Sequence, residues 1–211
     1  MSTVPHSDDE IHQASIDWLS GEVRPDDDVV DIGCGTGWMV RRLAATGATV
    51  IGVEPSESLV AAARANGLDV RLGSAEAVPL PAGCCSMIVC GVALPYMDPI
   101  RATREWSRLL RPGGRVVLTT HGLGYPMRHL RSHGRDLRAW VYAARMVLNT
   151  AVFAVLGRRL PGSVGDTLCH TTRMLSRLYQ AAGLELVSAR EWGAILGQPS
   201  FLAHRVRRSG D

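Results

Sequence analysis

The sequence predicts an α/β fold with a doubly wound, seven-stranded and mostly parallel sheet. Short runs of apolar, β-branched residues alternate with segments of helical spacing, and the connections between them are short. A glycine-rich stretch, "VVDIGCGTGW" over residues 29–38, contains the first of these runs and the turn that follows it. Because crossovers between parallel strands are right-handed, such a chain places helices on both faces of its sheet.

The alternating part of the chain contains five expected strands, which are too short and too β-branched for helices. They are residues 29–32, 49–53, 69–72, 86–90 and 115–120. The expected helices are residues 11–19, 38–45, 56–65 and 100–110. Glycine and proline end these helices, as at Gly47 and at Pro112-Gly113-Gly114.

Residues 122–169 break this alternation, and we expect them to form a helical lid inserted after the fifth strand. A helix at residues 172–182 follows, and strands at 184–189 and 201–206 complete the sheet. The loops at the carboxyl ends of the strands are where sheets of this type bind ligands. Functional residues are therefore expected at that edge.

The length and composition of the chain limit the classes of protein to which it can belong. A length of 211 residues with 46% hydrophobic residues fits one domain, residues 1–211, whose polar residues 1–10 are expected to be flexible. The five cysteines are an odd number without metal-ligand spacing, so we expect neither a disulfide framework nor a metal site. The first residues carry no signal-peptide pattern, and we expect a reduced, cytoplasmic protein.

Charge is divided unevenly along the chain. All 23 basic side chains are arginines. Residues 1–100 carry a net charge of −9, whereas residues 101–211 carry +12. Such asymmetry indicates an anionic partner or a membrane surface, or else two halves that neutralise each other in the fold.

The glycine loop at residues 33–37 admits three kinds of ligand. A phosphate-binding loop closes with Gly-Lys-Ser/Thr, and this chain contains no lysine. A dinucleotide loop needs a small residue where Trp38 stands, and Asp31 would repel a pyrophosphate. S-adenosylmethionine has no phosphate. Its ammonium suits Asp31, its carboxylate suits the loop amides and the next helix N-terminus, and its ribose suits Glu54, 21 residues after Gly33.

Four segments in order carry a resemblance to a known family. They are "VVDIGCGTGW" at 29–38, "VIGVEPSESLV" at 50–60, "GSAEAVPLP" at 73–81 and "LLRPGGRVVLTT" at 109–120. With "LSRLYQAAGLELVSA" further on, they resemble the motifs of class I S-adenosylmethionine-dependent methyltransferases that act on small molecules. The resemblance implies a Rossmann-like methyltransferase fold, with S-adenosylmethionine as cofactor and S-adenosylhomocysteine as its product.

The resemblance also implies a set of cofactor-binding residues, from the methionine end through the ribose and adenine to the sulfonium side. They are Asp31, Gly33, Cys34, Gly35 and Gly37, then Glu54 and Pro55, then Ser74, Ala75 and Glu76, and finally Cys90 and Gly91. Many relatives carry aspartate where Ser74 stands, so the backbone N–H of Ala75 would matter more here. Many also carry a histidine near Tyr96.

The candidate catalytic residues are His121, Tyr96 and Tyr125. His121 directly follows the fifth strand at the ligand-binding edge, and an ordinary imidazole pKa of about 6.5 suits a general base. The other histidines considered for this role are His129, His133 and His170.

A basic, amphipathic helix is expected within the insertion. One of its faces carries Arg131, Arg135, Arg138, Tyr142, Arg145 and Asn149, and another carries Leu137, Val141, Ala144, Leu148 and Val152. Three roles stay open: a cover over the site with solvated arginines, a binder of an anionic acceptor, or contact with an anionic membrane surface. Because Arg145 and Asn149 interrupt its apolar run, we do not expect it to span a membrane.

The expected function is methyl transfer by in-line displacement to a small-molecule acceptor, at an oxygen of a natural-product, glycan or lipid-like intermediate. The acceptor is expected to be anionic or amphipathic, and the protein a monomer or homodimer. No nucleic-acid partner is expected, because "GVALPYMD" at residues 91–98 is not the Asn/Asp-Pro-Pro-Tyr pattern of base methylation. The alternative is a catalytically inactive subunit that binds S-adenosylmethionine or regulates a partner.

Overall fold

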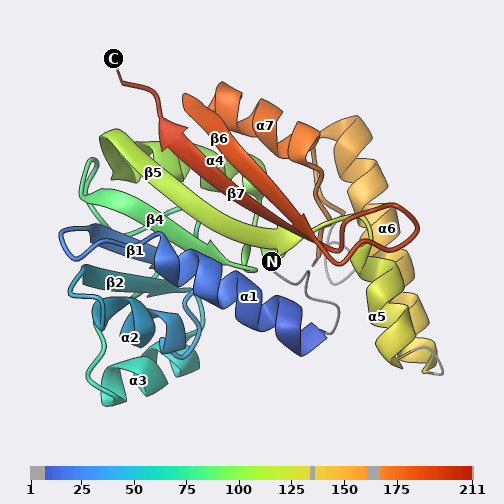
Figure 1. The fold of residues 1–211 in the computed structure, drawn as a ribbon, viewed down its shortest axis with the longest axis horizontal. Coiled ribbons are helices and arrows are strands. Elements are labelled where there is room, and N and C mark those ends of the chain that lie inside the picture. Colours follow the sequence, from blue (N-terminus) through green and yellow to red (C-terminus); the bar gives the residue numbers. More distant parts are fainter. Residues whose placement is uncertain (1–7, 134–135, 161–166, 211) are drawn as a thin grey trace, which may run out of the picture.

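The computed structural model of the chain describes residues 8–133, 136–160 and 167–210. Its centre is a seven-stranded sheet in the order β3-β2-β1-β4-β5-β7-β6, in which β7 is antiparallel to both neighbours (Figure 1). The strands are β1 (Asp28–Ile32), β2 (Thr49–Glu54), β3 (Val70–Leu72), β4 (Cys85–Gly91), β5 (Leu110–His121), β6 (Leu184–Trp192) and β7 (Phe201–Arg208). The predicted doubly wound sheet is confirmed.

Helices cover both faces of this sheet (Figure 1). On one face lie α1 (Asp8–Gly21), α2 (Trp38–Ala44) and α3 (Glu57–Ala65). On the other lie α4 (Pro99–Leu109) and α7 (Thr172–Ala181). A short 3-10 helix, η1 (Leu94–Tyr96), follows β4, whereas α5 (Tyr125–His133) and α6 (Leu137–Leu156) follow β5.

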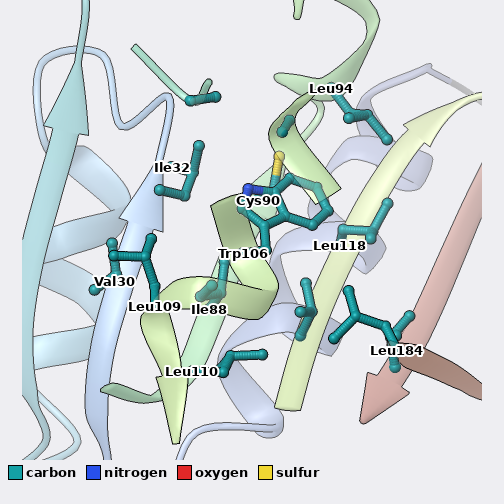
Figure 2. Close-up of a cluster of buried hydrophobic side chains, with 14 of the residues drawn as sticks. Val30, Ile32, Ile88, Cys90, Leu94, Trp106, Leu109, Leu110, Leu118 and Leu184 are labelled. Atoms are coloured by element: carbon teal, nitrogen blue, oxygen red, sulfur yellow. The ribbon is translucent and has the colours of Figure 1, made fainter. Parts of the chain in front are cut away.

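Alternation along the strands builds two hydrophobic cores. Val30 and Ile88 belong to the core beneath α4 and α7, whereas their neighbours Val29 and Met87 belong to the core beneath α1, α2 and α3. Figure 2 shows the first core, with Trp106 of α4 near its centre. Burial of both faces explains why the strands are continuous apolar runs in the sequence.

Two element boundaries differ from the sequence prediction. Helix α1 begins at Asp8, three residues before the expected start at residue 11, while residues 1–7 lie outside the described part. Strand β5 begins at Leu110 and continues through the Pro-Gly-Gly segment that was expected to precede it. Gly113 takes a φ of +74° there, and the pairing register with β4 shifts. The extra residues are thus absorbed as an irregularity within the strand.

The described part of the insertion after β5 contains α5 and α6, so the residues expected on one helix at 131–149 are divided between two helices. In helix α6, however, the face that carries Asn149 is directed inward, and the face that carries the leucines and valines is directed to solvent. Asn149 is fully buried, while Leu137, Val141 and Leu148 are between 49% and 76% exposed. The side of α6 that faces solvent is therefore apolar.

Candidate functional site

Two cavities open at the carboxyl ends of β1 and β4. The first, of about 540 Å³, lies between α1, the glycine loop, the end of β5 and α5. The second, of about 460 Å³, lies between the glycine loop, the end of β2 and the loop after β3. Both are lined by Gly33, Gly91, Val92 and Tyr96, so they form two ends of one site. The chain winds in opposite directions from β1 and β4, which is where doubly wound sheets bind ligands.

Three glycines shape the loop after β1. Gly33, Gly35 and Gly37 have φ values of +75°, +57° and +80°. A Cβ on Gly33 would lie 2.5 Å from the Cβ of Ala93, and one on Gly37 would lie 2.4 Å from the Leu68 side chain. A Cβ on Gly35 would meet nothing within 4 Å. Gly33 and Gly37 thus serve packing, while the Gly35 backbone borders open space.

Three backbone N–H groups of the glycine loop donate hydrogen bonds to residues at the end of β2. The Gly33 and Cys34 N–H groups both donate to the Val53 carbonyl, at 2.8 and 3.2 Å. The Gly35 N–H donates to Oε2 of Glu54 at 3.0 Å. We expected these amides to face the ligand's carboxylate. Instead, they tie the end of β1 to the end of β2 and fix the Glu54 side chain.

Two buried carboxylates border the site. Asp31 is 2% exposed and lines the first cavity, and its Oδ2 has no hydrogen-bond partner among the described residues. Glu54 lines the second cavity and also accepts the Ser56 N–H at 3.1 Å. Burial, reinforced by the charge of Glu54, raises the pKa of Asp31 to about 7. A cationic group at this point would stabilise the ionised Asp31, so the site fits the ammonium of S-adenosylmethionine.

The residues expected at the adenosine end come together in the second cavity. Pro55, Ser74, Ala75 and Glu76 all line it, alongside Glu54. One oxygen of Glu76 accepts the backbone N–H of Asp98 at 2.8 Å, so this carboxylate also anchors the loop before α4. The sequence did not single out the apolar wall of this cavity, which Val53 and Met97 provide.

The two predicted cysteines differ in position. Cys34 lines the first cavity, where burial raises the pKa of its thiol to about 12. Cys90 is fully buried beside Trp106 in the core and lines neither cavity (Figure 2). Its expected place beside the sulfonium is therefore corrected: alternation along β4 turns Cys90 inward with Ile88, and Gly91 alone reaches the site.

An aromatic wall closes the first cavity opposite the glycine loop. The rings of His121 and Tyr125 are stacked with centroids 3.6 Å apart and planes 7° apart. Phe201 and Tyr96 meet the His121 ring edge-on, at 5.7 and 6.4 Å. The three predicted catalytic residues therefore line one cavity, and Phe201 of β7 joins them.

The protonation of His121 differs from the prediction. The side chain is 3% exposed, and burial, with a smaller effect of His129, lowers its pKa to about 3. The ring is consequently neutral at pH 7 and is a weak base. Its Nδ1 has no hydrogen-bond partner among the described residues, and neither has Oγ1 of Thr119, on the same face of β5. Both side chains line the first cavity and offer polar contacts to a bound acceptor.

The other candidate histidines divide into two groups. His129 and His133 line the first cavity with rings stacked at 4.7 Å, and burial followed by the His133 charge lowers the pKa of His129. His170 is 1% exposed and is not among the residues of either cavity. Its Nδ1 lies 2.9 Å from Oγ1 of Thr120. His170 is therefore a structural residue.

Sequence reasoning missed one wall of the first cavity. His12, Ser15, Ile16 and Leu19 of α1 line it, because α1 lies across the sheet in front of the glycine loop (Figure 1). No motif marks these residues, and their helical spacing indicates only a shared face. Arg128 also lines this cavity and could have been found from its position one turn after Tyr125.

Comparisons with known proteins show which family the chain resembles in sequence. Residues 30–118 match the family model described as a methyltransferase domain. A probable S-adenosylmethionine-dependent methyltransferase of Mycolicibacterium smegmatis is 31% identical over 172 residues, 80% of this chain and 62% of the relative. An uncharacterized methyltransferase of Mycobacterium tuberculosis is 36% identical over 106 residues, 49% of this chain and 43% of the relative. The chain thus spans less than two thirds of these relatives.

The fold also matches solved structures. The crystal structure of an S-adenosylmethionine-dependent methyltransferase from Methanosarcina mazei superposes with a TM-score of 0.66 at 18% identity, covering 92% of this chain and 98% of the other. Its likeness concerns the fold. The family model and the sequence relatives identify the chain as a member of the class I S-adenosylmethionine-dependent methyltransferase family.

Proposed function

We propose that the chain transfers a methyl group from S-adenosylmethionine to an oxygen of a small-molecule acceptor in the first cavity. One observation carries this proposal. The two cavities meet at Gly33 and Gly91, so a ligand in one end directly adjoins a ligand in the other. Such an arrangement suits an in-line displacement between two bound molecules.

The cofactor would occupy the second cavity and the adjoining part of the first. Its ribose and adenine would lie along Glu54, Pro55, Ser74 and Ala75. Its ammonium would meet the unpartnered oxygen of Asp31, which lines the first cavity. When bound there, it supplies a methyl group already activated by a positive sulfur.

The acceptor would lie in the remainder of the first cavity, covered by α5, against which α6 packs. The stacked rings of His121 and Tyr125 offer a flat surface to an apolar or aromatic body. Thr119 and neutral His121 can hydrogen-bond a hydroxyl group on that body. These contacts exclude water and hold the acceptor oxygen in line with the transferred methyl group.

The hydroxyl proton must leave as the new O–CH3 bond forms. The depressed pKa makes His121 a hydrogen-bond acceptor that orients the hydroxyl rather than a base that keeps the proton. His129, which is only half-buried and lies in the same cavity, is the better proton acceptor. It can pass the proton to solvent through its exposed neighbour His133.

A methyl-transfer assay tests this proposal. The chain is incubated with S-adenosylmethionine and panels of hydroxylated, carboxylated and amine acceptors, and S-adenosylhomocysteine is measured. We expect product with hydroxylated acceptors, and a roughly tenfold or greater loss of kcat/KM in His129→Gln. Cofactor binding without turnover on any panel would favour the inactive binding subunit. Turnover confined to amines would contradict the oxygen acceptor.

A further inference from the structure

The solvent-facing side of α6 lies outside both cavities and is almost entirely apolar. Seven large side chains on this helix are between 49% and 82% exposed: Leu137, Trp140, Val141, Val147, Leu148, Val155 and Leu156. The helix is long and apolar enough to cross a membrane by length and composition, and only 28% of its most apolar window is buried. Figure 1 shows α6 at the outer edge of the molecule, beside α5.

The inward side of α6 explains why the helix is oriented this way. The Asn149 side chain donates to the Thr167 carbonyl at 2.8 Å and accepts the Leu160 N–H at 2.9 Å. Ala143 and Met146 pack in a small core with side chains of α5. The apolar residues on the opposite side are consequently held in solvent, the reverse of a helix that covers a core. Apolar surface of this extent marks a contact with a partner or a membrane.

The charge around α6 favours an anionic membrane over a second copy of this chain as the partner. Residues 122–181 contain nine arginines and two aspartates. Arg131 and Arg138 near one end of the helix and Arg158 near the other are exposed, and none forms an ion pair with a described residue. A second copy would bring the same positive charge against this face, and the two would repel. An anionic bilayer presents negative phosphates beside an apolar interior.

We infer that α6 docks this protein on the surface of a membrane that contains anionic phospholipids. The exposed apolar side chains enter the acyl region, and Trp140 lies at the boundary between the headgroups and the acyl chains. Arg131, Arg138 and Arg158 bind lipid phosphates. The helix lies in the plane of the membrane rather than across it, because its other side packs against α5. This role goes beyond the proposed methyl transfer and does not depend on it.

Vesicle flotation tests the inference. We expect the protein to float with phosphatidylcholine vesicles that contain phosphatidylglycerol and to stay behind with pure phosphatidylcholine. The double variant Val141→Glu/Leu148→Glu should lose at least about tenfold in partitioning. Each of Arg138→Gln and Arg158→Gln should lose about fivefold. Val187→Glu is the matched control, because Val187 is 54% exposed on β6, and it should float like the wild type.

A second measurement reports the depth of the helix. Tryptophan fluorescence should be quenched by vesicles with brominated acyl chains, and Trp140→Phe should abolish that quenching. The inference is overturned if the wild type ignores anionic vesicles or if the double variant binds them equally well. It is also overturned if sedimentation shows a dimer that the double variant dissociates while neither protein binds vesicles. None of the substituted residues lines the two cavities of the site, so failure here leaves the proposed methyl transfer intact.

Discussion

Asp31 is the buried carboxyl group that we expect to bind the ammonium of the cofactor. Its carboxyl group is 2% exposed, has one unpartnered oxygen, and shares the site with the buried Glu54. Desolvation and that second carboxylate hold its pKa at about 7 in the free protein. Binding of a cation favours the ionised form, so cofactor affinity and the ionisation of Asp31 are thermodynamically linked.

A titration of affinity against pH tests this linkage. The affinity for S-adenosylmethionine should rise as the pH increases from about 5.5 to 7, because protonated Asp31 must release its proton on binding; this window lies below the ammonium pKa of about 8. Asp31→Asn should remove that dependence and weaken binding by about 2 kcal/mol, roughly thirtyfold. Asp28→Asn, on the same strand but 41% exposed in its side chain, is the control. A flat wild-type profile would contradict this role.

Among the three loop glycines, Gly35 is the one at which we expect a side chain to affect a bound ligand, because a Cβ there would meet no protein atom within 4 Å. Gly35→Ala should cost about 1 kcal/mol of stability through its positive φ, and its new methyl group should remove most cofactor binding. Gly67→Ala is a matched control, since Gly67 also has a positive φ and a Cβ there would meet nothing within 4 Å, but it follows α3, outside the glycine loop whose Gly33 and Cys34 line the first cavity. Thermal melts and calorimetric titrations of both variants check this, and equal binding by the two would refute it.

At the scale of elements, the sequence predicted most of the alternating strands and helices. The apolar runs located the strands, and the motif order located Asp31 and Glu54 because a strand end and the following turn are adjacent in the chain. Cys90 was misplaced, although alternation with Ile88 along β4 would have turned it into the core. The lowered pKa of His121 could not be predicted from the sequence, because the rings that pack against it, Tyr125 of α5 and Phe201 of β7, belong to separate elements of the fold. The orientation of α6 depended likewise on Asn149 and its partners across a loop.

Asn149 fixes how α6 joins the rest of the insertion, and its removal should be costly. Asn149→Ala leaves the buried Thr167 carbonyl and the Leu160 N–H without their partner, at about 2 kcal/mol or more. For a chain of this length the melting temperature should fall by roughly 5 °C. Asn66→Ala, at the exposed end of α3, should change it far less. Equal melting of the two variants would argue against the role of Asn149.

At the scale of the whole molecule, part of the uneven charge is neutralised internally. Three ion pairs join arginines of the basic half to acids of the other: Arg115 with Asp27, Arg111 with Asp28, and Arg205 with Glu22. All three join residues of the sheet or its flanking segments, away from α5 and α6. None of these three ion pairs involves Arg131, Arg138 or Arg158, which remain available for the membrane contact inferred for α6.

Buried histidines make the whole fold sensitive to acid. Burial lowers the pKa of His121 and His170 to about 3 and that of His204 to about 4. These side chains take up protons only on unfolding once the pH falls below about 6.5, so stability is lost as the pH decreases towards 4. Asp31 acts in the opposite direction, because its raised pKa favours the folded state below pH 7 and this contribution is lost as the pH rises through that value.

The net effect is about two protons taken up on unfolding near pH 5. We expect the free energy of unfolding to fall by roughly 3 kcal/mol per pH unit there, as measured by urea denaturation. His204→Gln should remove about one of the protons taken up on unfolding and so reduce that slope by about 1.4 kcal/mol per pH unit, whatever its effect on the free energy of unfolding at neutral pH. A wild-type slope near zero would show that these histidines are not buried as described.

The central claim is that the joined cavities at the carboxyl ends of β1 and β4 bind S-adenosylmethionine, and isothermal titration calorimetry tests it most directly. We predict one ligand per chain for S-adenosylmethionine and for S-adenosylhomocysteine, with binding lost in Gly35→Ala and kept in Gly67→Ala. Absence of binding of either ligand to the folded wild-type protein at millimolar concentration would contradict the claim.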